Sequence, residues 1–254
     1  MGSLWNVSAE SLVSWVGVSD DGNRDLPETS RAFNLKSQLG IVQSKPLPAQ
    51  MKIYSEVAAK YLPALMDLFR QTPEVISLVS TLVNVISTTP YFIRFLRSPA
   101  GEGIAALQAH RVANAVTEIP SMSVDDVGEI GQFLSSLLIL QGIQDVSAED
   151  KAILLQHLPS WERQFRGRLA SETAGRCIAL FTDDPGMRPM MDAVRNMLEG
   201  KLDKCGGPGC VRRVQRDGSV LSQCGRCKSA VYCGVAHQKA AWATHKATCF
   251  PAVF

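Results

Sequence analysis

Six of the seven cysteines and two of the four histidines in this 254-residue chain lie between residues 205 and 249. They fall into four closely spaced pairs, which are Cys205/Cys210, Cys224/Cys227, Cys233/His237 and His245/Cys249. Structural zinc is held by four thiolate or imidazole ligands in a tetrahedron, and two ligands from one short turn satisfy half of such a site. Four pairs therefore predict two complete zinc sites with no ligand left over.

Disulfide bonds are the competing explanation, since six cysteines could form three bridges in an oxidising compartment. Three features oppose that explanation. The chain start lacks a basic segment followed by an apolar one, two histidines stand at ligand spacing, and Cys224-x-x-Cys227 has the spacing of a zinc knuckle. We therefore expect thiolate ligands and an intracellular protein of a reducing compartment, either cytoplasm or nucleus.

The complete ligand pattern resembles one known zinc finger. The pattern is Cys224-x2-Cys227-x5-Cys233-x3-His237-Gln238-x3-Trp242-x2-His245-x3-Cys249, with Tyr232 before the third pair, and it resembles the MYND finger. The resemblance covers residues 205–249. It departs at the first pair, which has a longer spacer than many members, and at His237, where most members have cysteine. Both departures keep residues that can bind zinc.

The resemblance implies an interleaved set of ligands for two structural Zn²⁺ ions. One ion would be bound by Cys205, Cys210, Cys233 and His237, and the other by Cys224, Cys227, His245 and Cys249. Four protein ligands leave no position for water or substrate, which indicates structural rather than catalytic zinc. Such metals substitute for a core that would be too small to fold alone.

The resemblance also implies a ligand. MYND fingers recognise short proline-containing peptides, often of the Pro-x-Leu-x-Pro type, in a groove beside the zinc sites. By that resemblance Gln238 would hydrogen-bond an extended peptide, and Trp242 would offer an apolar face to its prolines. The alternative for Trp242 is packing inside the finger. The expected partners are proteins that carry proline-rich motifs.

Charge divides the chain near residue 200. Residues 201–254 contain nine basic and two acidic residues, a net charge of +7, whereas residues 1–200 contain 17 basic and 22 acidic residues, a net charge of −5. The apolar residues of the long segment recur at helical spacing. We predict an all-helical domain over residues 1–200 and a MYND-type finger over residues 201–254.

Helix-start signals recur through the first 200 residues. We expect helices over residues 8–18, 73–87, 123–142, 160–181 and 185–198, another from Ser147, and hydroxyl–proline starts at Thr72-Pro73, Thr89-Pro90 and Ser98-Pro99. Seven to ten helices in succession predict a mainly α fold, either a multi-helix orthogonal bundle or an armadillo-like helical array. No fixed repeat period decides between the two.

A polar turn is expected at residues 19–25, after the first helix. Asp21, Asn23 and Asp25 occupy the first ligand positions of a calcium loop, but Leu26 stands where that loop needs glycine. We therefore expect no calcium site in this turn.

Residues 1–200 contain none of the sequence motifs for phosphate binding, a nucleophile elbow or a metalloprotease zinc pair. His110 and His157 lie far apart on expected helices and indicate surface or core histidines. Cys177 stands in an apolar segment, which favours a buried thiol over a nucleophile. Five residues follow Cys249 and the Asn-His-Ser-Cys signature of SET methyltransferases is absent, so we expect no enzyme.

The favoured function is a zinc-binding protein-interaction adaptor of the kind that acts in transcriptional co-regulation. The alternatives are an adaptor subunit of a ubiquitin-ligase complex and, ranked lower, a nucleic-acid-binding module or a SET-like methyltransferase. Two zinc sites of charge −1 each would leave the finger at +5, which allows only weak, salt-sensitive nucleic-acid binding. Arg212, Arg213 and Arg216 indicate a solvated basic loop, with an acidic partner or a phosphate backbone as the alternative. No apolar run reaches the roughly 18 residues of a membrane span.

Overall fold

The computed structural model describes residues 7–19 and 23–254. Within these residues ten α-helices precede the cysteine-rich segment, which itself contains a short hairpin and one further helix. The mainly α fold predicted from apolar spacing is confirmed. The middle of the expected polar turn, including Asp21, lies outside the described residues. None of the helices in the two described ranges is long and apolar enough to cross a bilayer.

Packing divides the chain into two compact units. The first contains Met1–Phe69, Thr88–Phe95 and Leu198–Phe254, and the second contains Arg70–Ser87 and Leu96–Met197. The cysteine-rich segment therefore packs in one unit with N-terminal helices. The boundary expected near residue 200, from composition and charge, stays a prediction.

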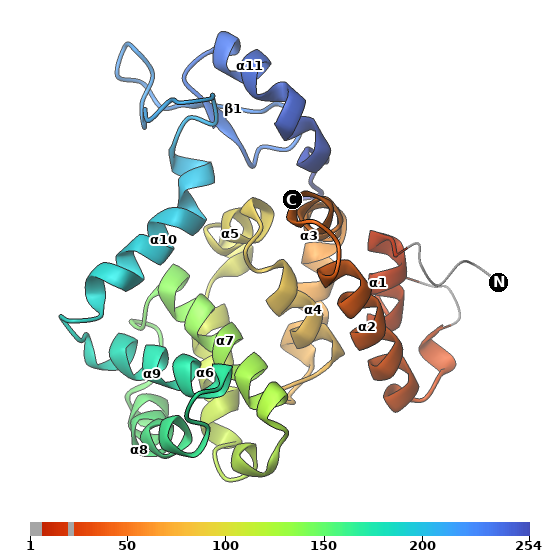
Figure 1. The fold of residues 1–254 in the computed structure, drawn as a ribbon, viewed down its shortest axis with the longest axis vertical. Helices are drawn as coiled ribbons and strands as arrows, with labels where there is room; N and C mark the ends of the chain where they lie inside the picture. The colour runs from red at the N-terminus through yellow and green to blue at the C-terminus, as the bar shows by residue number, and fades with distance from the viewer. Residues whose placement is uncertain (1–6, 20–22) are drawn as a thin grey trace. The chain divides into compact units, whose positions relative to one another are not determined.

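The first unit is built around helices that surround an aliphatic core. Its helices are α1 (Ala9–Val16), α2 (Glu28–Gln43), most of α3 (Leu47–Gln71) and most of α5 (Pro90–Leu96) (Figure 1). α1 begins at a capping box, in which the Ser8 and Ser11 side chains each accept the other's backbone N–H at 3.0 Å. The core of this unit includes Leu12, Val13, Leu35, Leu39, Val57 and Leu62.

The second unit is a set of helices centred on α9. Its helices are α4 (Leu78–Ile86), α6 (Ile104–Asn114), α7 (Val124–Gln141), α8 (Ala148–Gln164), α9 (Leu169–Thr182) and most of α10 (Arg188–Asp203). α9 packs against α7 and α8, and α6 packs against the same two helices. Ser123 and Ser147 cap α7 and α8 as expected, because each hydroxyl accepts a backbone N–H from the first turn.

Two of the three hydroxyl–proline pairs do not begin an α-helix. α4 begins after Ser77 rather than at Pro73, because Ser77, four residues later, forms a capping box with Ser80. Ser98-Pro99 begins only a 3₁₀ turn, Pro99–Gly101. The pair before α5 behaves as predicted, and Thr89 accepts a hydrogen bond from the third residue of the helix.

The single helix predicted over residues 160–181 is wrong, because the structure divides it between two helices. α8 continues through Pro159 as far as Gln164. Gly167 then takes a left-handed backbone conformation, with φ at 77°, and α9 begins two residues later. A φ in this range is open to glycine at low cost, so Gly167 marks the turn between the helices.

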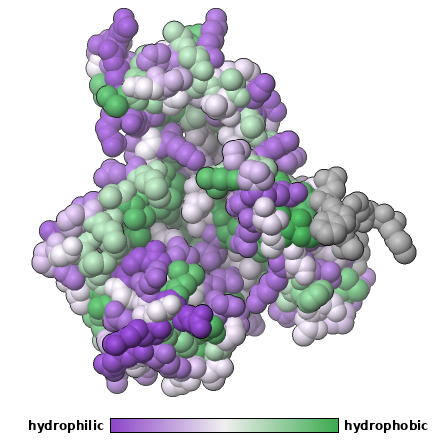
Figure 2. Space-filling view, viewed as in Figure 1, coloured by the Kyte–Doolittle hydropathy of each residue, from purple (hydrophilic) through white to green (hydrophobic). Residues whose placement is uncertain are grey.

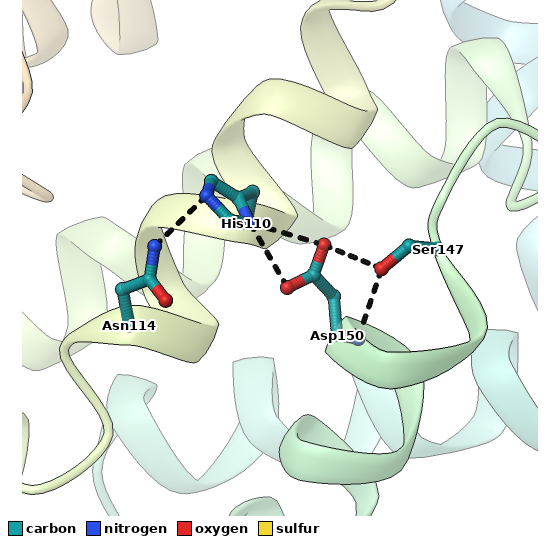
Figure 3. Close-up of polar contacts among 4 residues, drawn as sticks. All are labelled: His110, Asn114, Ser147 and Asp150. Carbon is teal, nitrogen blue, oxygen red and sulfur yellow. Dashed lines mark hydrogen bonds and ion pairs between the residues drawn. The ribbon is translucent and has the colours of Figure 1, made fainter.

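His110 joins two helices of the second unit (Figure 3). Its Nδ1 lies 3.1 Å from Oδ1 of Asp150, and its Nε2 lies 2.9 Å from Nδ2 of Asn114. The Nδ2 nitrogen of Asn114 can only donate, so Nε2 of His110 accepts, and the ring proton lies on Nδ1, facing the carboxylate. Asp150 also accepts from the Ser147 hydroxyl at 2.7 Å. The network therefore ties α6 to the first turn of α8, a structural role for His110.

Cys177 is a buried thiol in α9, as its apolar neighbours predict. Its side chain is fully enclosed, and burial raises the pKa of the thiol to about 12. The thiolate is the nucleophilic form of cysteine, so this position is inert near neutral pH.

Candidate metal centre

Four side chains from two distant stretches of the chain form the first cluster. Cys205, Cys210, Cys233 and His237 place their ligand atoms within 4.8 Å of one another. Nδ1 of His237 lies 3.4 Å from the Cys205 sulfur and 3.2 Å from the Cys233 sulfur, and the Cys210 and Cys233 sulfurs are 3.9 Å apart. Zn–S bonds of about 2.3 Å place two thiolates of a tetrahedron roughly 3.8 Å apart. The first cluster therefore fits a zinc ion.

The second cluster has the same composition of three thiols and one imidazole. Cys224, Cys227, His245 and Cys249 also lie with their ligand atoms within 4.8 Å of one another. The Cys224 and Cys249 sulfurs are 3.7 Å apart, and Nε2 of His245 is 3.5 Å from the Cys227 sulfur. These are again the distances between ligands of one tetrahedral zinc ion. The two predicted Zn²⁺ ions and their interleaved ligand sets are thus supported by the geometry.

A small hairpin and a helix bring the ligands together. β1 (Ser222–Gln223) pairs antiparallel with β2 (Val231–Tyr232), and α11 (Val235–His245) follows (Figure 1). The backbone N–H of Cys224 donates to Ala230 at 2.8 Å, which closes the Cys224–Cys227 knuckle. α11 then carries the two histidines, one near each end, so that each reaches a different cluster.

Gly207 is a position where only glycine fits beside the first cluster. A Cβ atom added there would lie 2.7–2.8 Å from the ring of His237. Contacts that short would displace either the backbone of the first knuckle or the imidazole itself. The spacer Gly-Gly-Pro-Gly between Cys205 and Cys210 is therefore shaped to let this imidazole approach.

Hydrogen bonds lower the pKa values of the thiols, whereas burial and neighbouring sulfurs raise them. Burial raises the pKa of Cys205, but backbone N–H groups of Cys233 and Gly207 point at its sulfur and lower that pKa to about 6 overall. Burial and the neighbouring sulfur of Cys227 instead raise the pKa of Cys249 to about 12. Crowded thiolates repel one another, so a divalent cation is the natural partner of each cluster, and binding it displaces protons.

Two residues outside the finger support the second cluster, and the sequence analysis did not identify them. Arg94 of α5 donates a hydrogen bond of 2.7 Å to the backbone oxygen of Cys227. The hydroxyl of Tyr91, one turn earlier, accepts the N–H of Phe250 at 2.8 Å and donates to the oxygen of Thr248 at 2.9 Å. These partners are separated by more than 130 residues in the chain, and no local spacing pattern signals such a contact.

The exposed face of α11 carries the two residues expected to bind a peptide. Gln238 is half-buried, and Trp242, one turn later, is 42% exposed. The Trp242 ring meets the ring of His245 edge-on, with centroids 6.0 Å apart. Val235 lies on the same face at helical spacing and is 66% exposed, although the sequence analysis did not identify it. Their role in peptide binding stays a prediction.

The basic loop begins directly after the ligand Cys210, and the backbone oxygen of Arg212 accepts the N–H of Cys205 at 2.9 Å. Arg212, Arg213 and Arg216 are all exposed, as the interpretation of a solvated loop requires. Val214 and Val220 form an isolated bridge across this loop, which returns at Gly218.

Residues 203–249 match the model of one protein family, the MYND finger. The matched segment contains all eight ligands of the two clusters. The resemblance inferred from the ligand spacing is confirmed. Comparison with curated proteins and with solved structures gave no match for the chain.

Proposed function

We propose, from the premise that residues 203–249 form a MYND finger, that this chain is a non-enzymatic adaptor whose finger binds proline-containing peptides of partner proteins. A MYND finger is a zinc-binding protein-interaction module. The peptide would bind to the exposed face of α11, and the side chains on that face favour a proline-containing sequence.

The observation that carries the proposal is a line of three accessible side chains on α11. Val235, Gln238 and Trp242 follow one another at helical spacing, and the valine and the tryptophan are substantially exposed. An exposed aromatic side chain next to a polar one is the combination that proline-rich ligands use, because they are extended and already ordered before binding.

Both side chains are available for a ligand. Within the described residues the side-chain amide of Gln238 makes no hydrogen bond, so its donor and acceptor are free for a peptide backbone. Trp242 packs one edge on His245, which fixes the indole, and its exposed part remains accessible. Packing inside the finger and contact with a peptide are therefore compatible for this residue.

The non-enzymatic part of the proposal rests on the ligand count. Each cluster supplies four protein ligands, and a zinc ion with four protein ligands has no coordination position for water or substrate. The metals would hold the finger in shape so that α11 can present its face. A titration of the full chain with a methyl donor tests the competing methyltransferase hypothesis, and saturable binding would contradict the proposal.

Calorimetry with the zinc-loaded full chain tests peptide binding. The probe is a synthetic peptide containing Pro-x-Leu-x-Pro, and the matched control peptide has both prolines replaced by alanine. We expect the first peptide to bind and the second to bind at least about tenfold more weakly, a difference of about 1.4 kcal/mol.

Variants locate the binding face. Trp242→Ala and Gln238→Ala should each weaken binding, whereas Lys246→Ala, an exposed position just beyond α11, should not. Zinc content, measured on each variant, separates loss of contact from loss of the finger. Equal binding by Trp242→Ala and wild type, with zinc retained, would contradict the assignment to α11.

A further inference from the structure

The second compact unit contains an open groove between α9 and the part of α10 that belongs to this unit. The groove has a volume of about 850 Å³. Its apolar lining consists of Leu169, Ile178, Ala179, Met187, Met190 and Val194. That volume lies within the roughly 300–1,000 Å³ typical of ligand clefts.

The groove exists because α10 leaves its apolar residues largely outside the core. Met191 is the one buried residue of α10 in the described structure, although the helix is amphipathic. Met190 of α10 and Leu169 of α9, which both line the groove, are 44% and 50% exposed. Figure 2 shows hydrophobic side chains over α10, bordered by hydrophilic ones. An exposed apolar surface of this kind, with a polar rim, marks an interaction site.

Methionines give the groove an adaptable surface. Met187 and Met190 both line it. Methionine is unbranched and polarisable, so it adjusts its shape to different apolar partners and is frequent where proteins bind amphipathic helices. The lining therefore suits the apolar face of a helix.

The rim of the groove is acidic. Glu162, Glu172 and Asp184 line it together with a single basic residue, Arg176, which gives a net charge of −2. The Arg176 guanidinium donates to Oε1 of Gln132, a neutral side chain, at 2.7 Å. All three acidic residues are exposed, with Glu162 on α8, Glu172 on α9 and Asp184 just after α9. Charge complementarity therefore favours a partner with lysine or arginine beside its apolar residues.

We propose that the groove between α9 and α10 binds an amphipathic helix of a partner protein, with lysine or arginine flanking its apolar face. The apolar face lies on Leu169, Met187 and Met190, and the basic residues meet Glu162, Glu172 and Asp184. This second site is independent of the finger and of its peptide. It would allow the chain to hold two proteins at once.

A designed peptide serves as the probe. It has 18 residues of leucine and lysine with all leucines on one helical face, and it carries a fluorescent label for polarisation measurements on the zinc-loaded full chain. The control peptide has the same composition in scrambled order and lacks an apolar face. We expect the amphipathic peptide to bind at least about tenfold more tightly than the scrambled one, because only it buries a continuous leucine face.

Two pairs of variants separate the apolar contact from the charge contact. Met190→Glu makes the groove more acidic, so weaker binding in this variant must come from lost apolar contact. Asn196→Glu is its control, because it adds the same charge at an exposed position on another face of the same helix. Glu172→Lys removes charge complementarity, and Glu102→Lys is its control at an exposed site outside the groove. We expect losses of about tenfold for the two groove variants and less than about twofold for the controls.

Three results would overturn the proposal. They are equal binding of the amphipathic and scrambled peptides, equal binding by groove and control variants whose circular dichroism matches wild type, and self-association of the chain that Met190→Glu abolishes. The last result, measured by sedimentation in the absence of peptide, would assign the groove to a second copy of this chain.

Discussion

The guanidinium of Arg94 donates to the backbone oxygen of Cys227 at 2.7 Å. The same guanidinium donates to the backbone oxygen of Phe254 at 2.7 Å and lies 4.5 Å from the centroid of that ring. Phe254 in turn packs edge-on against Phe95, and the N–H of Val253 donates to Ala59 of α3. The segment after the last zinc ligand is therefore bound to helices of the first unit, and it lies beside α3 (Figure 1). Contacts outside the finger should affect how firmly the second cluster holds its metal.

Arg94→Met should weaken zinc binding by the second cluster. The substitution keeps much of the apolar stem but removes two hydrogen bonds from a charged donor, each worth about 1.5–3 kcal/mol. We expect a lower Tm and faster zinc release to a chromophoric chelator. Lys52→Met, at an exposed position of α3, is the control for loss of charge. Release rates that match those of the control would show that Arg94 does not support the cluster.

Tyr91→Phe should destabilise the first unit. The hydroxyl is the shared partner of the Phe250 N–H and the Thr248 oxygen, and Tyr91 is only 2% exposed. Removing the hydroxyl leaves the Phe250 N–H and the Thr248 oxygen, both partly buried, without this partner, at a cost of about 1–3 kcal/mol. Urea unfolding monitored by tryptophan fluorescence measures this cost, with Tyr61→Phe as the control. A free energy of unfolding equal to that of the control would contradict the role assigned to the hydroxyl.

Gly207→Ala should disrupt the first cluster and spare the second. The added methyl group would meet the ring of His237 at 2.7–2.8 Å, which forces the imidazole out of place. Gly225→Ala is the matched control, because a Cβ at Gly225 has no neighbour within 4 Å. We expect about one zinc per chain for Gly207→Ala and two for the control, counted by native mass spectrometry. Two zincs in both would indicate that the knuckle can move aside.

Because of Cys177, the stability of the second unit should decrease as pH rises above 9. Burial raises the pKa of its thiol in the folded chain to about 12 from an ordinary value of 9.0. The fold therefore binds the thiol proton more tightly than the unfolded chain does. Its stabilising contribution is complete below pH 9 and decreases by about 1.4 kcal/mol per pH unit as pH rises toward 12.

The variant Cys177→Ala isolates this contribution, because all other titrating groups are shared with wild type. The difference in free energy of unfolding between wild type and variant should shrink from pH 9 upward. A difference that stays constant across this range would show that the thiol titrates normally and is not enclosed.

The metal ligands could be predicted from the sequence because zinc ligands occur in pairs that are close together in the chain. Each pair, such as Cys224/Cys227, comes from one short turn, and the tetrahedral requirement then fixes how many pairs a site needs. The helical class was predictable for a similar reason, since apolar spacing is a property of each segment by itself. Ser123 and Ser147 are helix starts for which the local hydrogen-bonding signal had no competitor.

The errors arose where two local signals competed or where a contact is distant in sequence. At Pro73 a plausible helix start gives way to the reciprocal bonds of Ser77 and Ser80, which satisfy two backbone groups instead of one. At Gly167 a single residue of left-handed conformation ends a helix that apolar spacing would continue. The bond between Arg94 and Cys227 depends on how the chain packs as a whole, which no segment of the sequence encodes alone.

The central claim is that two zinc ions hold the finger together, and counting them by native mass spectrometry tests it most directly. Structural zinc contributes about 10–16 kcal/mol in finger peptides, more than the usual stability margin of a domain. We predict two zincs for wild type and for Cys177→Ser. We predict at most one for Cys227→Ser, with loss of dispersed NMR signals from the finger. One or no zinc in the wild-type chain, or two zincs retained with dispersed finger signals in Cys227→Ser, would contradict the account.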